Sequence, residues 1–115
     1  MGHPIVHFEF AAKDAKKLQA FYGELFQWKI DFDNSMDYWM IDTGEGGFDG
    51  GIMQTQGDIT PYLTIYVKVE NLQAYLDKAE RLGGKTIVLP TPIPNIGSFA
   101  MFQDPEGNLV GLFKG

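Results

Sequence analysis

The 115-residue chain contains no cysteine, which excludes disulfides, thiolate-based zinc sites and thiol nucleophiles. It also lacks any uninterrupted apolar run near the ~18 residues of a membrane-spanning helix, and its amino terminus lacks the apolar region of a signal peptide. An absence of cysteine is typical of a reducing compartment. We therefore expect a soluble, cytoplasmic protein without a membrane partner.

Positive charge is scarce, with nine Lys and Arg against 15 Asp and Glu and a formal net charge of −6. Lys13, Lys16 and Lys17 lie close together, but their spacing fits the solvent-exposed face of a helix. A chain with this charge balance repels a phosphate backbone, so we expect no nucleic-acid partner.

Two common functional motifs, a phosphate-binding loop and a catalytic serine motif, are also missing. The glycine-rich stretch Gly44–Gly51 lacks the Lys-Ser/Thr ending and the following helix of a phosphate-binding loop, so we interpret it as a mobile connection and a candidate lid. No Gly-x-Ser-x-Gly motif occurs, and no second usable histidine completes a triad.

The hydrophobic pattern predicts a single domain of strands and two helices. Residues 4–10 alternate, which places Phe8 and Phe10 on one face of a strand and His7 and Glu9 on the other. Asp14 is expected to cap a helix that ends near Gln27. Further strands are predicted over residues 28–32, 38–42, 51–55, 62–69, 85–89, 98–103 and 108–114, and a second helix begins after Asn71. Five aromatic residues are predicted to lie in the core: Phe8, Phe10, Phe21, Tyr22 and Phe26.

The second half of the chain repeats the pattern of the first. A shift of 57 residues places His7 on Thr64, Asp14 on Asn71 and Gln54 on Gly111. The order strand, helix, three strands occurs in both halves, which indicates a duplicated supersecondary unit. We therefore predict one domain, residues 1–115, with modules at approximately 4–56 and 61–114. Pro90, Pro92 and Pro94 are expected to form a stiff connection.

Two motifs give the pattern a family resemblance. The first comprises His7, Asp14, Phe21-Tyr22 and Leu25-Phe26-x-Trp28; the second runs from Gly97 to Asn108 and includes Asp104-Pro105-x-Gly107-Asn108. Together they resemble the vicinal oxygen chelate superfamily, which includes glyoxalase I, extradiol dioxygenases and bleomycin-resistance proteins. The resemblance implies an α+β fold in which two tandem βαβββ modules form a cupped mixed sheet. It also implies a substrate bound in the cup and, as in many members, a homodimer.

The resemblance further implies where a metal would bind. In metal-dependent members the ligands come from the first and last strands of each module, and the corresponding positions here are His7, Gln54, Thr64 and Gly111. Those members have Glu at the position of Gly111, and glycine has no side chain to offer. We therefore expect no metal cofactor. If a divalent metal does bind, His7 and Gln54 would hold it, completed by water, Glu9 or a partner subunit.

The candidate ligand-binding residues are those expected to face the cup: His7, Glu9, Tyr38, Gln54, Tyr62, Thr64, Tyr66 and Phe113. Aromatic walls with a few polar groups suit a flat or apolar small molecule. Glu9 is the first candidate for a general base, and His7 for acid–base work. The alternative is that His7 and Gln54 only make structural hydrogen bonds, and that some of the tyrosines fill the core or a dimer interface.

Three functional hypotheses follow. The first is a metal-independent glyoxalase-like protein, binding or lyase-like, that holds an apolar or aromatic ligand. The second is a divalent-metal-dependent lyase, isomerase or dioxygenase of the same superfamily. The third is a drug-sequestering protein like the bleomycin-resistance members, whose acidic surface would attract cationic drugs.

Overall fold

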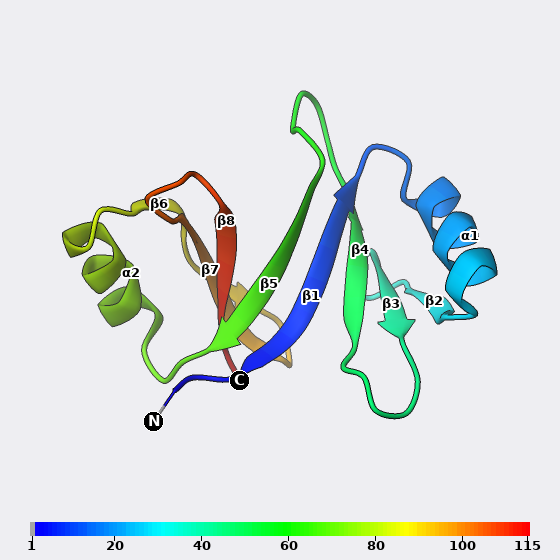
Figure 1. Ribbon diagram of the computed structural model, residues 1–115, viewed down its shortest axis with the longest axis horizontal. Helices are drawn as coiled ribbons and strands as arrows, with labels where there is room; N and C mark the ends of the chain where they lie inside the picture. The colour runs from blue at the N-terminus through cyan, green and yellow to red at the C-terminus, as the bar shows by residue number, and fades with distance from the viewer. Residues whose placement is uncertain (1) are drawn as a thin grey trace. The chain divides into compact units, whose positions relative to one another are not determined.

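The structure is a computed structural model that describes residues 2–115 (Figure 1). These residues form eight strands and two helices: β1 (Ile5–Ala12), α1 (Ala15–Phe26), β2 (Lys29–Asp33), β3 (Tyr38–Asp42), β4 (Gly50–Gln54), β5 (Tyr62–Lys68), α2 (Leu72–Arg81), β6 (Lys85–Ile93), β7 (Gly97–Gln103) and β8 (Leu109–Lys114). The order βαβββ occurs twice, which confirms the predicted α+β class and its two modules. Two compact units are present: residues 7–63, and residues 64–115 together with the segment that ends at Val6.

In the first unit the strands lie in the order β2-β3-β4-β1. β4 runs parallel to β1 and places Gly50 opposite Phe8 and Gly51 opposite Glu9. β3 is antiparallel to both β2 and β4. Helix α1 connects β1 to the rest of the unit and packs against β2 and β4 (Figure 1). A parallel pair needs such a crossover connection, because a short hairpin can join only antiparallel strands.

The core of this unit lies between α1 and the sheet. Its buried residues are Ala12, Ala15, Ile30, Ile41 and Ile52, and the partly buried Phe8, Phe10, Leu18, Tyr22, Trp28 and Trp39 pack against them. The core placement is therefore confirmed for Phe8, Phe10 and Tyr22. It was wrong for Phe21 and Phe26, which are 57% and 53% exposed. These two rings lie at the margin of the helix, where each contacts one core aromatic at centroid distances of 5.0 Å (Phe21 to Tyr22) and 5.1 Å (Phe26 to Trp28).

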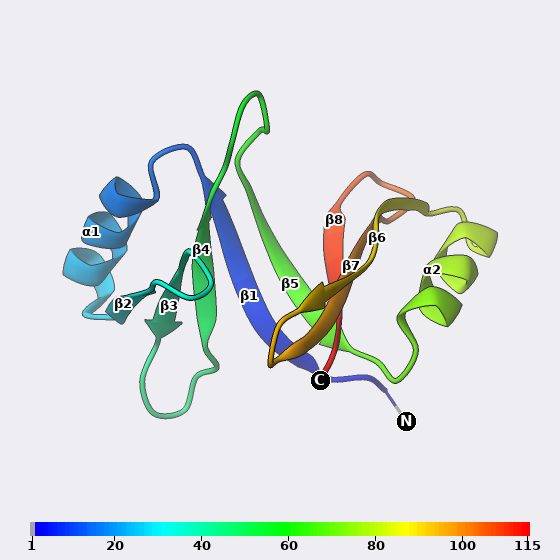
Figure 2. The ribbon, with the colours of Figure 1, turned by 180° about the vertical axis from the view of Figure 1, so that it is seen from behind.

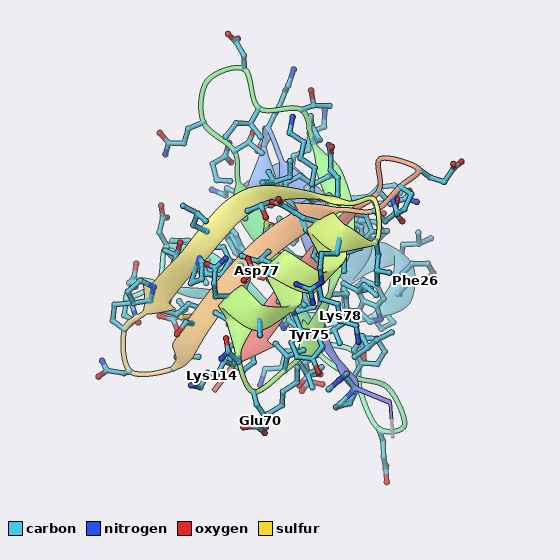
Figure 3. The ribbon with its side chains drawn as sticks, turned by 90° about the vertical axis from the view of Figure 1, so that its left-hand side faces the viewer. Phe26, Glu70, Tyr75, Asp77, Lys78 and Lys114 are labelled. Atoms are coloured by element: carbon cyan, nitrogen blue, oxygen red, sulfur yellow. The ribbon has the colours of Figure 1, made fainter. Side chains whose placement is uncertain are left out.

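The second unit repeats this arrangement in the order β5-β8-β7-β6. β8 is parallel to β5, and β7 lies between β8 and β6 and is antiparallel to both (Figure 2). Helix α2 lies across the strands of this unit, and Asp77 and Lys78 project from it into solvent (Figure 3). Its core is formed by Val69, Leu72, Leu76, Ala100 and Leu112. Full burial of a valine or leucine side chain contributes about 1.5–3 kcal/mol.

The proline-rich segment departs from the sequence prediction. A connection was expected after Leu89, whereas β6 continues to Ile93 and includes Pro90 and Pro92. β6 is the last strand in the order of its unit, and its pairing with β7 contains register shifts between Thr86 and Thr91. Proline is tolerated in an edge strand and at a bulge, because its missing N–H is not needed for the ladder.

Both predicted helix caps are confirmed. The Asp14 carboxylate accepts a hydrogen bond from the Lys17 amide at 3.0 Å, and the Asn71 side-chain oxygen accepts one from the Ala74 amide at 3.0 Å. Such a cap contributes about 1 kcal/mol. Helix α1 ends at Phe26, and the following Gln27 is its C-cap, with a left-handed φ of 62°. Within residues 2–115, neither helix has the length and apolarity needed to cross a membrane.

Candidate functional site

A cluster of four polar and aromatic side chains lies within the first unit. His7 and Glu9 are alternate residues of β1 and therefore share one face, opposite the face that carries Phe8 and Phe10 into the core. Tyr38 begins β3, and Tyr62 begins β5. The structure thus brings together four of the residues that were predicted from the sequence to bind a ligand: His7, Glu9, Tyr38 and Tyr62.

Glu9 is the centre of this cluster. The Tyr38 hydroxyl donates a hydrogen bond to Glu9 Oε1 at 2.8 Å, and the Tyr62 hydroxyl donates one to Glu9 Oε2 at 3.1 Å. The Glu9 side chain is only 6% exposed. A buried carboxylate is costly unless hydrogen bonds replace its hydration. The two phenols supply a donor to each oxygen and so allow a carboxylate in this position.

The hydrogen bond between His7 and Tyr38 indicates which group supplies the proton between them. His7 Nε2 lies 2.8 Å from the Tyr38 hydroxyl oxygen. Tyr38 has one hydroxyl proton and donates it to Glu9, so the hydrogen in the His7 contact must come from Nε2. With this donor direction, His7 carries a proton on Nε2. Tyr38 links the imidazole and the carboxylate in one chain of hydrogen bonds.

Burial raises the pKa of Tyr62 well above its ordinary value, and the negative charge of Glu9 and the hydrogen bond to it act in the same direction. At neutral pH the phenol therefore remains protonated and acts as a donor. Around Glu9, Tyr62 is a hydrogen-bond donor rather than a nucleophile.

We expect His7 to titrate below its ordinary value of 6.5. Burial lowers the pKa of His7, and the negative charge of Asp49 only partly opposes this effect. The unfolded chain then binds a proton that the folded chain does not bind, so His7 makes stability fall as the pH is lowered from 6.5 through the folded pKa. Proton NMR titration of the ring, with His7→Gln to assign its signals, measures this pKa directly. A midpoint at or above 6.5 would contradict the expectation.

Gln54 is not part of this cluster. Its amide oxygen accepts a hydrogen bond from the Ala15 amide at 2.9 Å, and its amide nitrogen donates to the carbonyls of Lys13 and, at 3.2 Å, Thr55. Gln54 pairs with Ala12, five residues from His7 along β1, which corresponds to about 16 Å of strand. The structure therefore does not place Gln54 beside His7 in the way a shared metal would require. Gln54 instead ties the end of β4 to the connection between β1 and α1.

The strand pairing identifies a different counterpart for Gly111. Glu9 pairs with Gly51 in the first unit, and Tyr66 pairs with Gly111 in the second. Glu9 and Tyr66 differ by 57 residues, the shift that relates the two first strands and the two helix caps, whereas Gly51 and Gly111 differ by 60. The segment from helix to last strand is therefore three residues longer in the second module. Gly51, which the sequence did not single out, is the structural equivalent of Gly111.

Both of these glycines lie against a tyrosine ring. A Cβ atom on Gly51 would lie 2.0 Å from the Tyr38 ring, and one on Gly111 would lie 2.4 Å from the Tyr66 ring. Neither distance is possible without movement of the ring. In each module, glycine therefore makes room for a tyrosine where a larger residue would place its own side chain.

The remaining predicted ligand-binding residues belong to the second unit. Thr64 is buried, and its hydroxyl donates a hydrogen bond to the Leu109 carbonyl at 2.5 Å. Tyr66 is 8% exposed and makes an edge-to-face contact with Phe99 at a centroid distance of 6.5 Å. Phe113 pairs with Phe99 across β7 and β8. In this unit the Thr64 hydroxyl is thus bonded to the backbone, and the Tyr66 ring packs on Gly111 and Phe99.

The donor set does not fit a resident divalent metal. Across residues 2–115, no three side chains of the His, Cys, Asp and Glu types come close enough together to hold an ion. Of the four positions carried over from metal-dependent proteins, His7 is bonded to Tyr38, Gln54 and Thr64 are bonded to the backbone, and Gly111 has no side chain. We therefore derive no chemical step through a metal.

Asp49 is a neighbour of His7 that the sequence did not reveal. It lies at the end of the glycine-rich connection, and its charge acts on His7. The adjacent Phe48 makes an edge-to-face contact with Phe8 at a centroid distance of 5.8 Å. The signal in the sequence was the placement of two larger residues after a run of glycines, but it gave no direction for either side chain. β4 begins at Gly50, which had been assigned to the connection, one residue before the predicted strand start at Gly51, and both glycines are buried.

Comparison with known proteins identifies a matching family and a curated relative. The sequence model of the Glyoxalase/Bleomycin resistance protein/Dioxygenase superfamily matches residues 4–112. The putative glyoxylase CFP32 of Mycobacterium bovis is 27% identical over 78 residues, which cover 68% of this chain and 30% of that protein. The chain thus spans less than a third of the length of this relative.

Two solved structures share the fold. Methylmalonyl-CoA epimerase from Mycobacterium tuberculosis superposes with a TM-score of 0.66 at 11% identity, over 96% of this chain and 86% of the other. A Mn(II)-bound glyoxalase from Novosphingobium aromaticivorans gives a TM-score of 0.66 at 16% identity, over 96% of this chain and 38% of the other. At these identities the likeness is one of fold.

Proposed function

Because the chain belongs to the Glyoxalase/Bleomycin resistance protein/Dioxygenase superfamily, we propose that it binds an apolar or aromatic small molecule without a resident divalent metal. The observation that carries this proposal is the pair of glycines under tyrosine rings. Gly51 and Gly111 occupy equivalent positions in the two modules, and each position is filled by the ring of Tyr38 or Tyr66. The position at which metal-dependent members have Glu thus carries no donor atom in this chain.

The polar end of the proposed site is the chain of hydrogen bonds through Glu9. A ligand with a hydroxyl or carbonyl group can exchange hydrogen bonds with Tyr62, the more weakly bonded of the two phenols at 3.1 Å. The aromatic faces of Tyr62 and Tyr38 offer contact area to a flat molecule. Phenol and carboxylate groups around an apolar site are the few polar groups that orient such a ligand.

A second candidate function is proton transfer at Glu9. It is supported by one observation, the buried carboxylate held between two phenol donors with His7 bonded to one of them. A carboxylate fixed in this way has the geometry of a general base. Glu9 would accept a proton from the substrate and later give it back, while Tyr62 keeps its own proton and donates a hydrogen bond to an oxygen of the substrate. This hypothesis places an isomerase- or lyase-like reaction on the same residues and requires no metal.

Metal content tests the first proposal. We expect purified protein incubated with Mn²⁺, Ni²⁺, Zn²⁺ or Fe²⁺ to contain clearly less than one equivalent after gel filtration, because the chain offers too few ligands. Elemental analysis measures this directly. One equivalent of metal that disappears in the His7→Ala variant would contradict the proposal and favour the metal-dependent alternative.

Ligand binding is tested by thermal shift with flat aromatic molecules of similar size that are anionic, neutral or cationic. We expect stabilisation by at least one of them and a smaller shift in Tyr62→Phe, which removes the donor to Glu9. Tyr75→Phe is the matched control, because Tyr75 lies on α2 and its hydroxyl bonds to His3. Stabilisation by cations alone would favour the drug-sequestering alternative. An unchanged melting temperature with all three kinds of molecule would contradict a binding function of this kind.

A further inference from the structure

A groove outside the Glu9 cluster lies beside the first half of α1, within the first unit. Its volume is about 640 Å³, within the usual range of 300–1,000 Å³ for small-molecule sites. Its apolar lining comprises Phe10, Leu18, Phe21, Pro61, Tyr62 and Leu63. Phe21 and Leu63 are 57% and 63% exposed, so much apolar surface faces solvent here. The groove therefore offers an apolar occupant more contact than an ordinary stretch of surface.

The groove also carries positive charge on an otherwise acidic protein. Lys13 and Lys17 both border it, whereas the chain as a whole has a formal charge of −6. The one acidic residue of the lining is Asp14, and its carboxylate accepts the capping hydrogen bond from the Lys17 amide. Two cations and one anion give the lining a local charge of +1. An anionic head group is therefore favoured here over a cationic one.

The segment that carries Lys13 is held in place. The Gln54 side chain donates to the Lys13 carbonyl and accepts from the Ala15 amide, so both sides of Asp14 are fixed to the end of β4. A site whose backbone is ordered before binding loses less conformational entropy when a ligand arrives. This role also accounts for Gln54, which the Glu9 cluster does not use.

From these observations we propose that the groove binds an amphipathic acid, with its apolar body on the Phe21 and Leu63 side chains and its carboxylate near Lys13 and Lys17. The proposal does not rest on the function proposed for the Glu9 cluster. Tyr62 is the residue that the two sites share, because it lines the groove and its hydroxyl donates to Glu9.

The test compares three probes with the same twelve-carbon chain: dodecanoate, dodecanol and dodecylammonium, each below its aggregation limit. Binding is followed by two-dimensional NMR, with amide shifts expected at Lys17, Phe21 and Leu63. We expect dodecanoate to bind most tightly and dodecylammonium least, because the three probes share one alkyl chain and their head groups are negative, neutral and positive. Equal affinity for all three, or shifts confined to other residues, would overturn the proposal.

Charge-reversal variants sharpen the test. The double variant Lys13→Glu/Lys17→Glu is expected to weaken dodecanoate binding by about tenfold at low salt, since exposed charges act through screened attraction. Lys16→Glu is the matched control, because Lys16 is an exposed residue of the same helix and does not border the groove. An equal loss in the control would overturn the proposal.

The apolar half of the site has its own variant. Leu63→Ser removes apolar contact at an exposed position that the fold does not need and should also weaken dodecanoate binding. Light scattering over a range of protein concentrations then reports whether a second copy of the chain covers this face. Dimerisation that excludes dodecanoate would assign the groove to a subunit interface and overturn the proposal.

Discussion

Replacement of Glu9 by alanine is expected to lower the free energy of unfolding by about 2–4 kcal/mol, through lost hydrogen bonds and a buried cavity. The variant removes the acceptor of two hydroxyl groups, those of Tyr38 and Tyr62. It also removes the partner that fixes the direction of the Tyr38 proton, so Tyr38 becomes able to donate to His7. Urea unfolding followed by circular dichroism measures the change in stability.

Two further variants show whether the stability is lost because Glu9 is buried and bonded to both phenols. Glu9→Gln preserves the shape of the side chain and should lose much less stability than Glu9→Ala, because its amide can still bond both phenols. Glu106→Ala is the surface control, since Glu106 is exposed in the turn before β8. If Glu9→Ala were no less stable than Glu106→Ala, the carboxylate could not be the buried centre of the cluster.

The second large effect is expected at Gly51. Gly51→Ala should lower the free energy of unfolding by about 1–3 kcal/mol, the usual cost of overpacking a well-packed site. The new methyl group would meet the Tyr38 ring at 2.0 Å and displace it from Glu9. Ligand binding that depends on the cluster should be lost with it. Chemical denaturation and the thermal-shift assay measure the two effects.

A double-mutant cycle identifies the ring as the cause. In a Tyr38→Ala background, Gly51→Ala should cost little, and the difference between the two backgrounds is the coupling energy. Gly23→Ala is a control of opposite sign, because Gly23 lies inside α1 and a Cβ there would come no closer than 3.7 Å to another group. Alanine in a helix is more stable than glycine by about 0.5–1 kcal/mol. An equal cost of Gly51→Ala in both backgrounds would show that the tyrosine ring is not involved.

Local signals in the sequence were sufficient for most of the fold. The caps at Asp14 and Asn71 were predictable because short polar side chains before an apolar helical pattern bond the first amides. The extent of β6 was not, since whether Pro90 disrupts a strand depends on whether that strand lies at an edge. The exposure of Phe21 was not predicted, because helical spacing shows which face of a helix is apolar but not how much of that face the core covers.

The candidate site was predictable only in part. Alternation along β1 placed His7 and Glu9 on one face, and that placement needs no information beyond the strand itself. The contact of Glu9 with Tyr38 spans 29 residues and depends on how β1, β4 and β3 are paired. The equivalence of Gly51 with Gly111 was hidden for the same reason. A constant shift cannot follow a repeat whose connections differ in length.

The glycine and tyrosine pairs limit the evolutionary routes open to this chain. A glutamate introduced at position 51 or 111 by one codon change would collide with Tyr38 or Tyr66 before it could serve as a ligand. Metal chelation at these positions would also require a smaller residue in place of the tyrosine, and at position 38 that replacement removes a hydrogen bond to Glu9. The two chemistries are therefore separated by an epistatic barrier, and engineering a metalloenzyme on this scaffold must exchange both members of a pair at once.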